Sequence, residues 1–167
     1  LILFILCIMC IASSWIALGT IPAHRVKLYK YAVLAMAIGG GLTLLLITQG
    51  TLALSPWYAP HYMVPIAGMV FANTMNSVSL AAERLQAELE NRDSFIEARN
   101  IAFQAAMIPV INSLFAVGLV SLPGMMTGQI LSGISPFIAA RYQIMVMAMI
   151  FGSSGLSTAL YLSFVKS

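Results

Sequence analysis

The fold class is decided by a run without charged side chains, residues 31–54, whose sequence is YAVLAMAIGGGLTLLLITQGTLAL. A transmembrane α-helix needs about 20 predominantly apolar residues, so this run is long enough to cross a bilayer once. A membrane β-strand would alternate apolar and polar side chains, and this run does not alternate. Because lipid offers no partner to open backbone groups, we expect a membrane-spanning α-helix here.

The rest of the chain extends this pattern. Of its 167 residues, 60% are hydrophobic and only 8% are charged, whereas soluble domains carry roughly a quarter charged residues. This composition excludes a disordered chain, a secreted disulfide scaffold and a free nucleic-acid-binding protein. It predicts an all-α, polytopic transmembrane bundle. The five expected spans are residues 1–20, 31–54, 63–82, 108–132 and 142–165.

The charges also predict how the chain crosses the membrane. The connection 21–30 carries three cations and no anion, whereas the connection 55–62 carries no formal charge. By the positive-inside rule, the first is cytoplasmic and the second is outside. The charged segment 83–99 is then cytoplasmic and the connection 133–141 is outside, with Arg141 as a weak exception. We expect a multi-pass protein of the cytoplasmic (inner) membrane.

The beginning of the chain has neither an initiator methionine nor a basic flank. Leu1 stands inside or at the edge of the first span, so we expect the sequence to be N-terminally incomplete. Cys7 and Cys10 form a C-x-x-C pair, but in an apolar helix two buried thiols are a better interpretation than redox or metal chemistry.

The cytoplasmic segment has the pattern of a helix that leaves the membrane. Arg84 and Glu88 are four residues apart and can form an ion pair on one helix face. Periodicity alone leaves two interpretations open, a solvated loop with some helix or a docking element for a cytoplasmic partner.

A second helix can begin shortly afterwards. Asp93 or Ser94 can serve as its N-cap, and Glu97 falls in its first turn, where an acidic side chain is favourable.

Several uncharged polar side chains lie within the expected spans. Amides in lipid are costly unless they pair across helices or line a wet cavity. Interhelical hydrogen bonding and a substrate path are therefore both open for each residue. The candidate path residues are Asn73, Asn76, Asn112, Thr127 and Gln129.

The expected fourth span carries a proline followed by a row of small residues. Pro123 should kink this helix because it removes one backbone hydrogen bond. Gly124, Gly128 and Ser132 are four residues apart and would allow another helix to approach closely. A helix that moves and a static kinked helix fit the pattern equally well.

Motifs for chemistry are missing from the sequence. It contains no P-loop, no H-E-x-x-H and no G-x-S-x-G, so we expect neither an enzyme nor catalytic residues. The eleven methionines follow no repeated ligand spacing and are better explained as packing residues than as soft-metal ligands. His24 and His61 fall on opposite sides of the membrane and cannot share a metal ion.

Four stretches go beyond composition: 64–69 (VPIAGM), 73–76 (NTMN), 108–112 (IPVIN) and 117–128 (VGLVSLPGMMTG). They closely resemble the FetB-like (YbbM-like) permeases, which are membrane subunits of an ABC transporter linked to iron export in bacteria. Plant relatives are associated with aluminium tolerance. The resemblance covers most of the chain from about Pro65 onward.

The resemblance implies a function and partners. Residues 1–167 would form a single permease domain, and complete members of the family have about seven helices. A cytoplasmic ABC ATPase would bind MgATP, and this chain would need no cofactor of its own. Residues 83–106 would couple to that ATPase, and two permease copies would assemble in the bilayer. The candidate coupling contacts are Glu83, Arg84, Glu88 and Glu97.

The sequence departs from the family pattern in one internal place. An L-G-A-T-P-like element is absent around Arg92 and Asp93, either because the loop is short or because residues are missing from the sequence, and we expect the latter.

Because the spans offer no carboxylate, we expect a low-affinity path rather than a tight metal site. Two alternatives stay open: an ABC permease for an organic metabolite or lipid, and a non-transporting scaffold that recruits a soluble partner.

Overall fold

The computed structural model describes residues 1–22, 24–51, 60–91, 94–120 and 122–165, except for the side chain of His61. All regular elements within these ranges are helical, which confirms the expected all-α membrane bundle. They are α1 (Ile2–Ala17), the 3₁₀ turn η1 (Leu18–Thr20), α2 (Arg25–Leu45), the π-helical η2 (Leu46–Thr51), α3 (Pro60–Asn91), α4 (Phe95–Ala116), α5 (Gly124–Leu131) and α6 (Pro136–Phe164).

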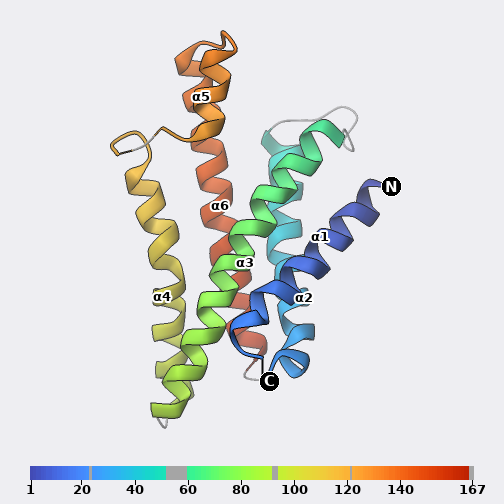
Figure 1. Ribbon diagram of the computed structural model, residues 1–167, viewed down its shortest axis with the longest axis vertical. Coiled ribbons are helices and arrows are strands. Elements are labelled where there is room, and N and C mark those ends of the chain that lie inside the picture. Colours follow the sequence, from blue (N-terminus) through green and yellow to red (C-terminus); the bar gives the residue numbers. More distant parts are fainter. Residues whose placement is uncertain (23, 52–59, 92–93, 121, 166–167) are drawn as a thin grey trace.

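The helices run up and down along the long axis of the molecule, with α3 in the centre (Figure 1). α3 packs against α1, α2, α4 and α6, and α2 also packs against α6. The ends of α1, α3 and α6 and the starts of α2 and α4 lie together at the lower end in Figure 1. This alternation agrees with the order of crossings that the charges predict.

Four helical segments within the described residues are long and apolar enough to cross a membrane. They are Ile2–Thr20, Arg25–Thr51, Tyr62–Asn91 and Pro136–Phe164. These correspond to the first, second, third and fifth spans expected from the sequence. The helices of the second, third and fifth spans each include charged residues outside the expected apolar run. A helix can continue into water, because its polar end is solvated there.

The prediction of one continuous fourth span over 108–132 is wrong. α4 ends at Ala116 and α5 begins only at Gly124, although the two together run from the lower to the upper end of the molecule (Figure 1). Gly118 has a φ of +83°, which no helix interior allows, and Pro123 is the extended N-cap of α5 with a ψ of 143°. The expected kink at Pro123 is therefore a break of the helix.

Small side chains hold the helices close together. On α4, Ala98, Ala102 and Ala106 follow one another at intervals of four residues, and all are fully buried. On α2, a Cβ atom at Gly39 would lie 2.8 Å from the backbone nitrogen of Ser157 on α6. Because lipid is as apolar as the side chains, such close backbone contact is what drives helices together in a membrane.

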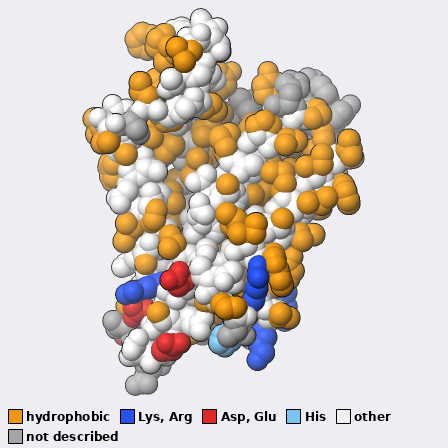
Figure 2. All heavy atoms as spheres, viewed as in Figure 1, with side chains coloured by type: hydrophobic (Ala, Val, Ile, Leu, Met, Phe, Trp, Pro, Cys, Tyr) orange, Lys and Arg blue, Asp and Glu red, His pale blue; other side chains and the backbone are white. Residues whose placement is uncertain are grey.

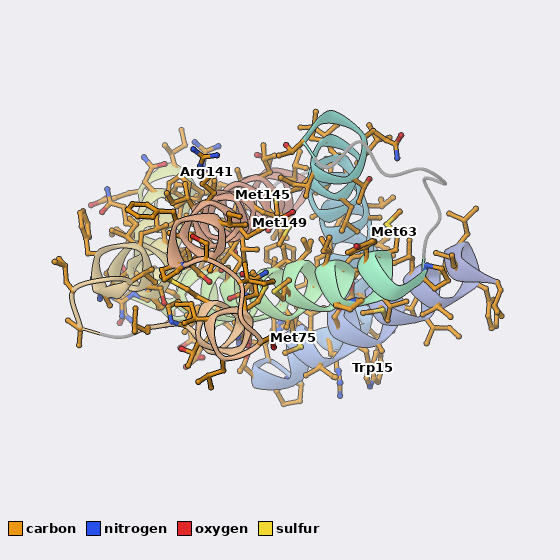
Figure 3. The ribbon with its side chains drawn as sticks, turned by 90° about the horizontal axis from the view of Figure 1, so that it is seen from above. Trp15, Met63, Met75, Arg141, Met145 and Met149 are labelled. Carbon is orange, nitrogen blue, oxygen red and sulfur yellow. The ribbon has the colours of Figure 1, made fainter. Side chains whose placement is uncertain are left out.

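The charged side chains visible in Figure 2 gather at the lower end, and the surface above them is largely hydrophobic. This distribution suits a bundle whose upper part is in lipid and whose lower end meets water. Arg141, which the sequence places in the opposite connection, lies instead near the start of α6 and is exposed at the rim of the bundle in Figure 3.

The methionines serve as packing residues, as the sequence predicts. Met63 and Met149 are buried, and Met75 and Met145 pack against the buried core (Figure 3). The flexible thioether fills irregular gaps between helices. Among the described residues, no group of three or more His, Cys, Asp and Glu side chains is placed to hold a metal ion.

Candidate functional site

A cavity of about 430 Å³ lies between α3, α4 and α6, beside the break between α4 and α5. We call it the amide cavity because two asparagines from α3 line it. Its lining residues are Asn73, Asn76, Ser77, Leu80, Ala106, Pro109, Val110, Ser113, Val117, Pro123, Met147 and Ile150.

Three of the four polar side chains of the amide cavity share one face of α3, and the fourth, Ser113, is on α4. Asn76 and Ser77 follow Asn73 by three and four residues, the spacing that places side chains together on a helix. The Asn73 Nδ2 group donates a hydrogen bond to the carbonyl oxygen of Met69 at 2.8 Å, which holds its amide in place. Thr74 is turned into the core instead, and its hydroxyl donates to the carbonyl oxygen of Val70 at 2.9 Å.

The break between α4 and α5 adds backbone polarity to this cavity. Val117, just after α4, and Pro123, just before α5, both line it. The cavity therefore adjoins the C-terminal end of one helix and the N-terminal end of another, which carry opposite partial charges. Pro109 cannot donate a helical hydrogen bond, so one α4 carbonyl one turn earlier is left without its usual donor.

The chemistry of the amide cavity is polar but uncharged. None of the described residues that line it carries a formal charge. It can offer amide and hydroxyl oxygens to a passing solute, but it cannot balance a buried charge with a side chain of opposite sign. Weak binding is what this arrangement can support.

The structure separates the five path residues predicted from the sequence. Asn73 and Asn76 line the amide cavity, whereas Asn112 is exposed on α4 and is not among its lining residues. Thr127 and Gln129 lie on α5, and the Thr127 hydroxyl donates to the carbonyl oxygen of Pro123 at 3.2 Å.

Sequence reasoning missed two hydroxyls of the amide cavity. Ser77 lies four residues after Asn73, and Ser113 lies four residues after Pro109. The helical spacing from residues already singled out could have identified both. Serines are common in membrane helices, however, and their side chains often bond only to their own backbone.

A second cavity of about 540 Å³ lies on the other side of Val117 and Met147, between α4, the break, α5 and α6. We call it the apolar cavity because almost all of its lining side chains are hydrophobic. Gln143 is the exception. It is only 4% exposed, and its Oε1 atom has no hydrogen-bond partner within the described part of the chain.

The expected coupling region forms a helical hairpin from the end of α3 and the start of α4. Arg84 and Glu88 form the predicted ion pair, at 2.6 Å. Ser94 is the N-cap of α4 and accepts a hydrogen bond from the backbone N–H of Glu97, as the sequence predicts. Residues 92–93, including the alternative cap Asp93 and the junction with Arg92, lie outside the described residues.

The four candidate coupling contacts differ in accessibility. Glu83 and Glu97 are exposed and Arg84 is half exposed, so a partner could reach them. Glu88 is only 8% exposed, so its carboxylate is packed inside the protein and offers little surface to a partner.

The row of small residues on α5 does not join two helices of the described chain. A Cβ atom at Gly124 or Gly128 would meet nothing within 4 Å, and no residue of α5 is buried. Ser132 is exposed, and its hydroxyl donates to the carbonyl oxygen of Gly128 at 2.8 Å. The row therefore packs against no other helix among the described residues, and a seam between two copies stays a prediction.

Comparison with known proteins gives the family. The model of the family described as "Uncharacterised protein family (UPF0014)" matches residues 1–101 and 92–167, which together span the chain. The chain belongs to the UPF0014 family. This UPF0014 chain is a multi-pass membrane protein, and a bacterial inner membrane is consistent with its helices.

Relatives of this UPF0014 chain occur in bacteria and plants. A UPF0014 membrane protein of Synechocystis is 36% identical, and the probable iron export permease protein FetB of Escherichia coli is 33% identical. In each case the match covers 94% of this chain and 66% of the relative. The protein ALUMINUM SENSITIVE 3 of Arabidopsis thaliana is 34% identical over 81% of this chain and 55% of its own length. The chain thus spans two thirds or less of these relatives, and no solved structure matches it significantly.

Proposed function

We propose that this UPF0014 chain is the membrane permease subunit of an ABC transporter that exports iron or a related metal across the cytoplasmic membrane. The observation that carries this proposal is the amide cavity, a space with amide and hydroxyl side chains in its wall beside the break between α4 and α5. Discontinuous helices near polar cavities are a recurrent way to build transport sites in membranes. A relative named as a probable iron export permease supports the choice of substrate.

The side chains of the amide cavity suit a passing metal better than a stored one. Iron binds oxygen and nitrogen ligands, and Asn73, Asn76 and Ser113 offer neutral oxygens there. Because no described lining residue is a carboxylate, binding would be weak and release easy. A transporter needs this balance, since a tightly held ion does not move on.

Energy would come from a separate subunit. The sequence has no P-loop, so MgATP would bind to a partner ATPase in the cytoplasm. The hairpin at residues 83–106 would dock on that ATPase, with the exposed Glu83 and Glu97 among its contacts. Two permease copies would serve two ATPases, and the open row on α5, Gly124, Gly128 and Ser132, is the candidate seam between the copies.

Purification of the full-length protein from its native membrane tests the class of protein. Recovery of a P-loop ATPase in about one-to-one ratio would support the transporter. If no ATPase is retained under conditions that preserve other such complexes, the hairpin is not a coupling element, and a scaffold function takes its place.

Transport by the reconstituted complex tests the path. We expect Asn73→Leu and Asn76→Leu to lower ATP-dependent iron flux strongly while leaving assembly with the ATPase intact. Asn112→Leu is the matched control, since the same change on α4 falls outside the amide cavity. Equal flux in all three variants and the parent protein would remove the amide cavity from the path.

The alternative is a permease for an organic metabolite or lipid. The apolar cavity favours it, because an apolar space with one buried amide is typical of sites for organic molecules. Stimulation of ATP turnover by such a compound, together with indifference to iron, would establish this alternative. Gln143→Leu should then reduce the stimulation, whereas Asn76→Leu should not.

A further inference from the structure

A groove of about 380 Å³ lies between the start of α4 and the end of α6, at the charged lower end of the bundle in Figure 1. We call it the arginine groove because Arg99 lines it. Its lining residues are Arg99, Asn100, Phe103, Gln104, Ala159, Leu162 and Ser163. None of them lines the amide cavity or the apolar cavity, so the groove is a separate feature of the molecule.

The polar side chains on the α4 side of the arginine groove are accessible hydrogen-bond donors. Arg99 is half-buried, and Asn100 and Gln104 are exposed. Gln104 follows Asn100 by four residues, the spacing that places two side chains one above the other on a helix. None of the three makes a hydrogen bond or an ion pair within the described residues. A guanidinium and two amide groups are therefore available to a ligand that accepts hydrogen bonds.

The charge of the arginine groove is positive. No Asp or Glu is among the described residues that line it. Glu97, the other charged residue of α4, is two positions before Arg99, which turns it by about 200° around the helix axis. The groove therefore favours an anion, and its lining offers no carboxylate to a positively charged group.

The α6 side of the arginine groove is apolar. Ala159 and Leu162 form this wall, and the Ser163 hydroxyl is engaged, because it donates to the carbonyl oxygen of Ala159 at 2.7 Å. The apolar surface continues along both helices toward the middle of the bundle. Ile108 follows Gln104 by four residues, Leu156 precedes Ala159 by three, and both are exposed.

The arginine groove lies where the charged end of the bundle meets its apolar surface. Arg99 is the last charged residue of α4, and the sequence has no further charged residue until Arg141. At this level the cytoplasmic leaflet presents its phospholipid headgroups, and anionic headgroups attract basic side chains.

We propose that the arginine groove binds one anionic phospholipid of the cytoplasmic leaflet. The lipid phosphate accepts hydrogen bonds from Arg99, Asn100 and Gln104, and the acyl chains lie along Ile108 and Leu156. A phosphate pairs well with a guanidinium because both can form two parallel hydrogen bonds. A zwitterionic lipid fits less well, since no carboxylate in the lining can balance its cationic group. A free phosphate leaves the apolar wall without a partner.

This inference goes beyond the proposed transport function and does not rest on it. The groove faces α6, whereas the proposed ATPase contacts Glu83 and Glu97 do not line it. A lipid that bridges α4 and α6 would stabilise the packing of the first turns of α4, because a bound molecule favours the conformation that it fits.

The first experiment titrates the complete protein in an uncharged detergent with phosphatidylglycerol and follows the rise of its melting temperature. Phosphatidylcholine with the same acyl chains is the matched lipid, because it has the same phosphodiester but also a cationic group. We expect phosphatidylglycerol to bind about fivefold more tightly, the usual effect of one basic side chain on an anionic lipid. Equal stabilisation by the two lipids would overturn the proposal, because it would leave only apolar contact.

The second experiment uses variants of the arginine groove. Arg99→Gln should weaken phosphatidylglycerol binding about fivefold and leave phosphatidylcholine binding unchanged. The protein should still fold, because Arg99 makes no ion pair within the described residues. Arg141→Gln is the control, since this arginine is exposed near the start of α6 and does not line the groove. Parent-like affinity of Arg99→Gln, or an equal loss in both variants, would refute the site, because attraction would then depend on net charge alone.

Inorganic phosphate distinguishes a lipid from a soluble anion. We expect it neither to raise the melting temperature nor to displace phosphatidylglycerol. If inorganic phosphate stabilises the parent protein but not Arg99→Gln, the groove takes its anion from solution, and the lipid proposal is overturned. These measurements need neither the ATPase nor a metal, so their failure would leave the transport proposal untouched.

Discussion

A close approach between α2 and α6 at Gly39 gives a sharp test of the fold. A Cβ atom at Gly39 would lie 2.8 Å from the backbone nitrogen and 3.0 Å from the Cα atom of Ser157, and it would also meet the Ser157 hydroxyl. The substitution Gly39→Ala must therefore push α2 away from α6, because a backbone cannot rotate aside as a side chain can. Forcing one methyl group into a packed interface costs about 1–3 kcal/mol.

Helix propensity acts in the opposite direction and sets the control. Replacing a helical glycine by alanine gains up to about 1 kcal/mol, so the net loss at Gly39 should be about 1–2 kcal/mol. At about 2–4 °C per kcal/mol for a protein of this size, the melting temperature should fall by several degrees. Gly41 is on the same helix, and a Cβ atom there would meet nothing within 4 Å. Gly41→Ala should leave the melting temperature unchanged or raise it.

The assay is thermal unfolding in detergent, followed by intrinsic fluorescence for the parent protein and both variants. Ser157→Gly in the Gly39→Ala background should recover only part of the loss, because it removes the hydroxyl but leaves the backbone atoms in place. A Gly39→Ala variant as stable as Gly41→Ala would show that α2 and α6 do not meet at this point.

Three further predictions concern the hairpin and the break. Arg84→Ala removes one end of the 2.6 Å ion pair with Glu88. Because the carboxylate left behind is only 8% exposed, stability should fall by more than about 1 kcal/mol, with a smaller loss in 1 M salt, as thermal unfolding at two salt concentrations would reveal. Ser94→Ala removes the N-cap of α4 and should lower the free energy of unfolding by about 1 kcal/mol. Amide hydrogen exchange in the first turn of α4 should therefore become faster, and an unchanged exchange rate there would contradict the role of Ser94 as the cap. Gly118→Ala places a side chain at a φ of +83° and should lower the melting temperature, because left-handed backbone costs a residue with a Cβ about 1–2 kcal/mol. Gly124→Ala meets open space and should be tolerated, so equal effects of the two glycine substitutions would exclude backbone strain as the cause.

Much of the local structure was predictable because it depends on neighbours in the chain. The N-cap at Ser94 and the ion pair of Arg84 with Glu88 follow from spacings of three and four residues. The break between α4 and α5 was not predictable from hydropathy, since the run 117–124 (VGLVSLPG) is as apolar as a helix interior. Only the positive φ of Gly118 and the extended Pro123 end the helix there.

The candidate site was predictable only in part. Asn73 and Asn76 could be paired from their spacing on one helix, and both line the amide cavity. Asn112 is exposed on α4 and does not line the cavity, and the sequence contains no signal for how α4 is rotated. A cavity between helices depends on how each one is turned, which is decided by contacts far apart in the chain.

The sequence by itself determined that this protein is a helical bundle in lipid with one charged end. Hydropathy and charge are properties of each segment alone, and the bilayer acts on each segment separately. Only the tertiary structure decided which small residues join the helices. The buried row is Ala98, Ala102 and Ala106 on α4, whereas the similar row on α5 faces outward. Both rows have the same spacing, so spacing does not decide which row packs against another helix. A row is buried only where another backbone lies close to it, and that depends on the assembled bundle.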